Sequence, residues 1–65
     1  MKIRLNGEAV ETRIPNILEL VKARDLDLSS LVVEHNHTII QQTAWADTLL
    51  QEGDTIELLC FVGGG

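Results

Sequence analysis

The fold of this chain is decided by one stretch near its start, KIRLNGEAVETRI at residues 2–14. Polar and apolar residues alternate through residues 2–5, and Asn6-Gly7 follows at once. Asn-Gly favours a type I′ turn, which needs positive φ at both central residues, so the stretch predicts a hairpin. The returning strand is expected over residues 8–14.

A helix is expected directly after this hairpin, which Pro15 ends. Asn16 followed by Glu19 fits a capping box, in which the Asn side chain accepts an amide of the first turn and the Glu side chain reaches back. Apolar residues recur at helical spacing through residues 17–21. We expect the helix to end near Asp25.

The rest of the chain predicts three further strands. Residues 31–35 are rich in β-branched side chains, residues 36–38 favour a tight turn, and a short strand begins at residues 39–40. Residues 43–50 suit a short helical or irregular segment that covers one end of the core. The last strand is expected over residues 55–62.

This order of elements predicts an α+β domain of the β-grasp arrangement, in which a mixed sheet of four to five strands packs on one main helix. We assign the domain to residues 1–62. Residues 63–65 are three glycines, and we expect them to form a flexible C-terminal tail.

Length and composition restrict the class of protein. Sixty-five residues make one domain and leave little room for a deep catalytic pocket. Leu, Ile and Val supply 21 residues against one Trp and one Phe, so the core should be aliphatic. A single cysteine cannot form an internal disulfide, and neither a membrane span nor a signal peptide is evident. We therefore expect a cytoplasmic protein.

The net charge of −5 is divided unevenly along the chain. All five Lys and Arg residues lie in residues 1–24 with three acids, whereas residues 25–65 hold seven acids and no Lys or Arg. Nucleic acid and anionic membranes are therefore disfavoured as partners. A basic protein surface would complement the C-terminal half. The acids Glu52, Asp54 and Glu57 would steer such a partner, but their simpler interpretation is a solvated rim.

The sequence shows no catalytic or metal-binding motif. It has neither a P-loop nor a GxGxxG motif, so ATP would have to be bound by a partner. His35 and His37 fall short of a zinc-ligand set. Cys60 has no cation or second cysteine beside it in sequence, and a lone cysteine in a strand is typically a small buried hydrophobe. We expect no catalytic residue, no bound cofactor and no metal.

The three C-terminal glycines are the residues of this chain that most clearly indicate a chemical role. Three extended residues reach about 10 Å beyond the last strand. Because they lack Cβ atoms, Gly63 and Gly64 would thread a channel that excludes larger residues. Gly65 would bring its carboxylate to the end of that channel. A carboxylate is a poor electrophile until a partner adenylates it. The alternative is a frayed terminus without function.

The last strand predicts a docking surface beside this tail. If Ile56 and Leu58 face the helix, Leu59 and Phe61 face outward. Exposed apolar side chains near a reactive terminus favour partner docking, and we assign this surface to Leu59, Phe61 and Val62. The alternative is that Phe61 folds over the sheet edge as a minor part of the core.

Several motifs of this chain occur together in one known family. In order they are NG at 6–7, NHTII at 36–40, W at 45, EGD at 52–54, TIEL at 55–58 and FVGGG at 61–65. The chain resembles the ThiS family in the order of these motifs, in its length and in its terminal glycines. Members of this family are the sulfur-carrier proteins of thiamin thiazole biosynthesis and have the ubiquitin-like β-grasp fold. The resemblance covers essentially the whole chain. It departs at Gln41-Gln42, where many family members carry Pro-Arg.

The resemblance implies that Gly65 is the carrier site. An E1-like adenylyltransferase, similar to ThiF, would activate its carboxylate with ATP. A sulfur donor system would then leave a thiocarboxylate, and a thiazole synthase, similar to ThiG, would receive the sulfur. The chain would be a covalently modified cosubstrate and not an enzyme. Two alternatives stay open: a small subunit of molybdopterin synthase, and a β-grasp interaction domain whose tail is never activated.

Overall fold

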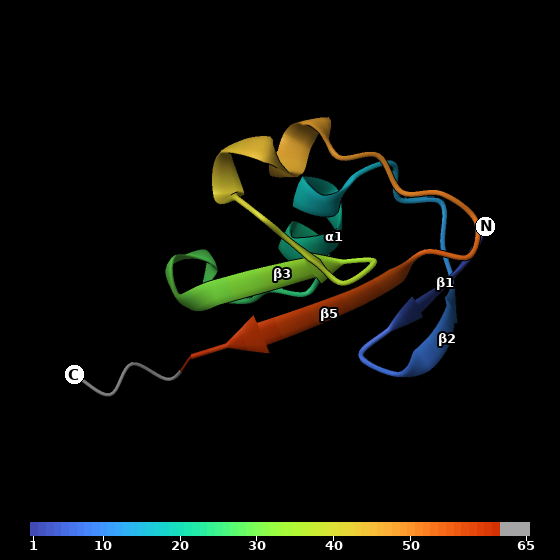
Figure 1. Cartoon of the computed structure of the whole chain (residues 1–65), viewed down its shortest axis with the longest axis horizontal. Coiled ribbons are helices and arrows are strands. Elements are labelled where there is room, and N and C mark those ends of the chain that lie inside the picture. The colour runs from blue at the N-terminus through green and yellow to red at the C-terminus, as the bar shows by residue number, and fades with distance from the viewer. Residues whose placement is uncertain (62–65) are drawn as a thin grey trace.

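The predicted N-terminal hairpin forms in the computed structural model, which describes residues 1–61 (Figure 1). Strand β1 (Lys2–Leu5) pairs antiparallel with β2 (Glu8–Glu11). Asn6 and Gly7 have φ angles of 49° and 86°, both positive as the type I′ turn requires. The hairpin prediction is therefore confirmed.

Strand β2 ends at Glu11, whereas the sequence pattern predicted a strand that continues to Ile14. Glu11 lies opposite Lys2, the first residue of β1, and Thr12 makes one last bond from its amide to the carbonyl of Met1. The amide of Ile14 instead donates to Oγ1 of Thr12 at 3.1 Å and so makes no ladder bond to β1. The strand therefore ends where its main-chain groups find partners outside the ladder, which its own alternation does not show.

Helix α1 (Ile17–Ala23) begins where the cap was predicted. Asn16 is extended, and its Oδ1 accepts a hydrogen bond from the amide of Glu19 at 2.8 Å. The bond satisfies one of the amides that a helix leaves free at its start. The helix buries Ile17, Leu20 and Val21 against the sheet.

The five strands form one mixed sheet in the order β2-β1-β5-β3-β4. Strand β5 (Thr55–Cys60) lies in its centre, parallel to β1 and antiparallel to β3 (Leu31–His35). The short β4 (Thr38–Ile40) pairs antiparallel with β3 at the edge. Figure 1 shows α1 on one side of this sheet, which confirms the predicted β-grasp arrangement.

Two short 3-10 helices close the ends of the core: η1 (Leu28–Ser30) and η2 (Gln42–Asp47). Trp45 in η2 is 1% exposed, and its Nε1 donates to the carbonyl of Ile40 at 3.0 Å. The buried core is otherwise aliphatic, as composition predicted: Ile3, Leu5, Ile17, Leu20, Val21, Leu31, Val33, Leu50 and Ile56. In residues 1–61, every helix is too short or too polar to cross a membrane.

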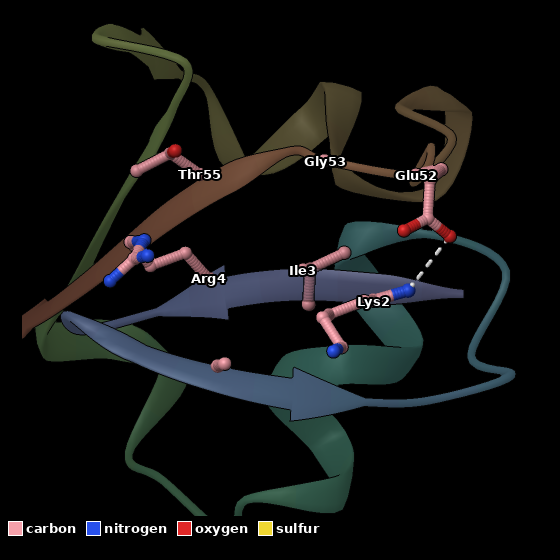
Figure 2. Close-up of a pocket in the computed structure, with 7 residues that line it drawn as sticks. Lys2, Ile3, Arg4, Glu52, Gly53 and Thr55 are labelled. Atoms are coloured by element: carbon pink, nitrogen blue, oxygen red, sulfur yellow. Dashed lines mark hydrogen bonds between the residues drawn. The ribbon is translucent and has the colours of Figure 1, made fainter.

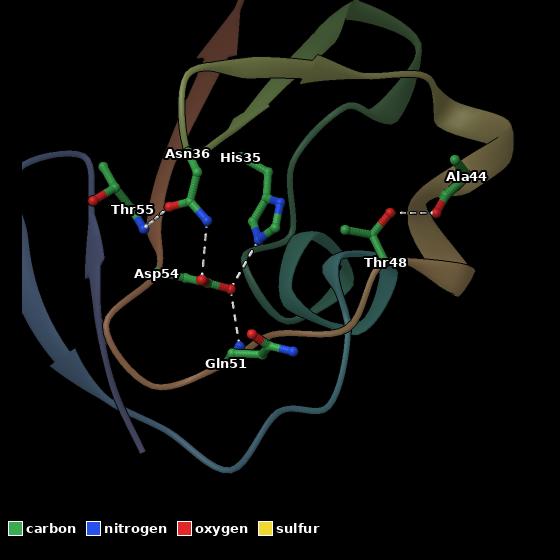
Figure 3. A network of polar contacts seen from close by, with 7 residues as sticks. All are labelled: His35, Asn36, Ala44, Thr48, Gln51, Asp54 and Thr55. Carbon is green, nitrogen blue, oxygen red and sulfur yellow. Dashed lines mark hydrogen bonds and ion pairs between the residues drawn. The ribbon is translucent and has the colours of Figure 1, made fainter.

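A buried carboxylate clamps the start of β5 (Figure 3). Asp54 is 7% exposed, and its Oδ2 lies 2.8 Å from Nε2 of His35 and accepts the amide of Gln51 at 2.9 Å. Its Oδ1 accepts Nδ2 of Asn36 at 3.0 Å, and Asn36 in turn accepts the amide of Thr55. Assigning Asp54 to a solvated rim was therefore wrong, because protein donors replace the water that an exposed carboxylate would bind.

The same contacts set the protonation of this carboxyl. Burial by itself would raise the pKa of Asp54, but hydrogen bonds from His35, Asn36 and the Gln51 amide outweigh burial and hold the pKa below its ordinary value. A group with a depressed folded pKa stabilises the fold above its unfolded pKa. That stabilisation is lost as the pH falls through the folded pKa.

We expect Asp54→Asn to lower the free energy of unfolding at pH 7 by about 1–3 kcal/mol, because an amide nitrogen would face donors that now bind carboxylate oxygen. Urea unfolding of wild type and variant measures the difference, with Asp47→Asn at an exposed position as the control. The gap should shrink as the pH falls below the folded pKa of Asp54. A gap that stays constant down to that pH would contradict the assignment.

Candidate functional site at the end of strand β5

The candidate site is the C-terminal end of β5, which main-chain bonds hold in place up to the last described residue. Its start is fixed by the Asp54 clamp, and β3 pairs with it from Ile56 to Cys60. The amide of Phe61 donates to the carbonyl of Ser30 at 2.9 Å. The sequence-predicted residues Val62, Gly63, Gly64 and Gly65 lie outside the described residues. The structure thus shows a hydrogen-bonded strand immediately before them in sequence.

The outward side of this strand end is apolar, as the alternation predicted. Leu59 is 44% exposed and Phe61 is 61% exposed. Ile56 is fully buried and Leu58 packs against the core. Phe61 therefore does not belong to the core, and the alternative interpretation is wrong.

Acidic side chains accompany this apolar surface. Glu34 on β3 lies directly opposite Glu57 on β5, and the next outward pair along the two strands is Val32 and Leu59. Both glutamates are half-buried. Like charges directly opposite each other on a sheet are destabilising, so a cationic group from outside would relieve this pair. The surface thus combines apolar area with an unfavourable pair of negative charges.

Cys60 does not match its expectation, because it is exposed. Its position on the strand faces the helix side, but Leu58 is the last residue of β5 that packs against the core. The strand therefore runs beyond the layer that would bury Cys60. The thiol is accessible, and within residues 1–61 it lies in no cluster of potential metal ligands.

The fold places the two histidines in different environments. His35 binds Asp54, while His37 is exposed at the β3–β4 turn with a φ of 72°. Among residues 1–61, His, Cys, Asp and Glu side chains do not gather in groups of three or more that could hold a metal.

A shallow pocket lies at the opposite end of β5, around Thr55 (Figure 2). Its volume is about 200 Å³, and its lining consists of Lys2, Ile3, Arg4, Ala9, Glu52, Gly53 and Thr55. This volume is below the roughly 300–1,000 Å³ of typical ligand pockets. Glu52 accepts the amide of Lys2 at 2.9 Å, so a carboxylate lies beside the two cations. This carboxylate offsets the positive charge that Lys2 and Arg4 bring to the pocket.

Two residues that position the site were missed as such by sequence reasoning. Asp54 was assigned to partner steering or a solvated rim, and Asn6 only to the hairpin. In the structure, Oδ1 of Asn6 accepts the amide of Leu58 at 2.7 Å and so ties the hairpin turn to β5. The sequence separation of these two residues is 52, and no local spacing could reveal their contact.

Fold and site together define a ubiquitin-like β-grasp protein. The end of its central strand is partly exposed, and a glycine-rich sequence follows that strand. Residues 3–65 match the model of the ThiS family. The chain belongs to the ThiS family.

Solved structures and sequence relatives agree with this assignment. The crystal structure of thiamine biosynthesis protein ThiS from Geobacter metallireducens matches over the full length of both chains, with a TM-score of 0.85 and 29% identity. The uncharacterized protein ycf40 of Trieres chinensis is 34% identical over 62 residues, which are 94% of this chain and 85% of that protein.

A third relative is a thiazole synthase of Magnetococcus marinus, 35% identical over 66 residues. The match takes in 100% of this chain and 20% of the synthase. This chain therefore spans about a fifth of the length of that thiazole synthase.

We expect Phe61→Ala to change the free energy of unfolding by less than about 0.5 kcal/mol, because the ring is mostly in water. Ile56→Ala, on the same strand but fully buried, should cost about 2–5 kcal/mol. Urea unfolding of both variants tests the assignment of the two faces of β5. A large loss of stability in the Phe61 variant would show that the ring packs in the core.

Proposed function

We propose that this chain is a sulfur carrier of thiamin biosynthesis and that Gly65 carries the sulfur. The main support is the family match over residues 3–65, joined to an exposed apolar strand end directly before the glycine sequence. The structural neighbour from Geobacter metallireducens is itself a thiamine biosynthesis protein. In this proposal the chain is a cosubstrate, and the chemistry is performed by its partners.

The proposed chemistry begins at the carboxylate of Gly65. One carboxylate oxygen attacks the α-phosphorus of ATP held by an E1-like, ThiF-like adenylyltransferase, and pyrophosphate leaves. Sulfide-level sulfur from a donor system then attacks the carbonyl carbon, and AMP leaves with that oxygen. The product is a thiocarboxylate, in which one oxygen has been replaced by sulfur. Gly63 and Gly64 would cross the narrow entrance of the partner's site, since they have no side chains to exclude.

The described residues contribute position and recognition to this scheme. The exposed side chains of Leu59 and Phe61 provide apolar docking area, to which Val62 would add. The facing pair of Glu34 and Glu57 favours a partner with a basic side chain at this place. These features fit a protein that presents its end to another protein's active site.

The proposed acceptor of the sulfur is a thiazole synthase, similar to ThiG. Support comes from the Magnetococcus marinus relative, in which a stretch similar to the whole of this chain is part of a protein named thiazole synthase. A molybdopterin synthase small subunit and an interaction domain with an unmodified tail are the other outcomes that the following experiment separates.

Incubation with ATP, a ThiF-like adenylyltransferase and a sulfur donor system should replace one oxygen by sulfur, as read from the intact mass. Deletion of Gly65 should abolish this exchange. Cys60→Ser should retain it, and a persulfide on Cys60 would instead add a whole sulfur atom to the mass. Transfer of the sulfur to a ThiG-like synthase supports the thiazole role. Transfer only to a molybdopterin synthase large subunit, or no exchange with an active adenylyltransferase, would contradict it.

We expect Phe61→Ala to weaken binding to the adenylyltransferase about tenfold, because an exposed aromatic side chain at the centre of a docking surface contributes over about 1 kcal/mol. Isothermal calorimetry measures the change. Lys22→Ala, on the exposed side of α1, is the control that should bind as wild type does. Equal affinity of both variants would exclude this ring from the interface.

A further inference from the structure

Strand β5 extends well beyond its neighbour β1. The β1–β5 pairing comprises only Arg4 opposite Thr55 and Leu5 opposite Ile56, whereas pairing with β3 continues to Cys60. The hairpin turns away after Leu5, and Figure 1 shows β5 running on past it. The end of β5 therefore has a neighbouring strand on one edge only.

The hydrogen-bond pattern identifies which main-chain groups face the free edge. Phe61 donates to Ser30, and Asn36 donates to the carbonyl of Thr55, so the odd-numbered residues of β5 bond toward β3. Main-chain groups alternate in direction along a strand, so those of Leu58 and Cys60 point the other way. The amide of Leu58 bonds Asn6 on that side, as expected.

Three groups remain on this edge: the carbonyl of Leu58 and the amide and carbonyl of Cys60. Within residues 1–61 the hydrogen bonds outside regular ladders include none from these groups, and β1 has already ended. The side chains of Leu59 and Cys60 are exposed as well. The end of β5 is thus open on both faces and along one edge, which is the geometry that accepts an additional strand.

We propose that the edge of β5 formed by Leu58 and Cys60 takes an extended segment of the adenylyltransferase as an added strand. This inference rests on the proposed function, because the edge lies immediately before Val62 and the glycine tail in sequence. A protein that receives Gly65 would therefore bind close to this edge. Asn6 closes the edge at Leu58, so the added strand forms its bonds only next to the tail.

Charge favours this partner over a second copy of the chain. Residues 25–65 carry seven acids and no Lys or Arg, and Glu57 lies beside the edge on the same strand. Pairing two copies along this edge would bring their acidic strands together, which like-charge repulsion opposes. A partner segment that contains basic residues has the complementary charge.

Amide hydrogen exchange measured by NMR tests the proposal on the unaltered chain. In the free protein, the Cys60 amide should exchange freely while the Leu59 amide, bonded toward β3, is protected. Addition of the ThiF-like adenylyltransferase should slow exchange at Cys60 at least about tenfold. An unchanged rate at Cys60 in a saturated complex would overturn the proposal. Concentration-dependent protection of Cys60 without the enzyme would also overturn it, since a second copy would then be the occupant.

A proline substitution removes the donor in question. Cys60→Pro lacks the amide but leaves the bonds toward β3 intact, and proline is tolerated on strand edges. We expect it to lose affinity for the adenylyltransferase about tenfold relative to Cys60→Ala, which keeps the amide. Near-equal affinity of the two folded variants would contradict the added strand.

These outcomes separate the inference from the proposed function. If wild type acquires sulfur but Cys60 gains no protection and both variants bind alike, the added strand is excluded and the carrier role stands. If Cys60 gains protection while the intact mass never changes, the added strand stands and the carrier role fails. Should Cys60→Pro unfold, circular dichroism will show it, and the exchange measurement on wild type decides alone.

Discussion

The pairing of β5 with both β1 and β3 is the interaction on which this structure depends. It joins the first strand of the chain to the last one, and it places Ile56 at the centre of the core. Asp54 fixes where this pairing starts, because its carboxylate binds groups from the β3–β4 turn and from the loop before β5. Without that clamp, β5 could slip along its neighbours, and a slip of one residue would exchange its buried and exposed faces.

The two ends of β5 lie in different environments. The start is buried, paired on both edges and held by charge-assisted hydrogen bonds. The end is paired on one edge, and Leu59, Cys60 and Phe61 are exposed there. A small domain can thus hold one end of a strand firmly while the other end stays accessible.

Local patterns carried most of the fold prediction. Asn6-Gly7 predicted its turn because both residues adopt positive φ, and Asn16 predicted the helix start because its side chain accepts an amide of the first turn. Alternation in the last strand predicted that Ile56 is buried and Leu59 exposed. The same reasoning failed where a neighbour distant in sequence decided the outcome. Cys60 was expected to be buried because a lone cysteine in a strand typically is, and that rule does not show how far the covering layer extends.

The sequence by itself therefore determined the elements, their order and the apolar outer face of the last strand, because each depends on residues within a few positions of one another. Tertiary structure alone decided that the buried carboxylate of Asp54 holds the start of β5 and that Asn6 binds the amide of Leu58. It also decided that β5 continues beyond the end of its pairing with β1. Each of these is a contact or an end point set by segments that folding brings together. Such contacts depend on strand lengths and registers in three dimensions, and a one-dimensional pattern does not contain them.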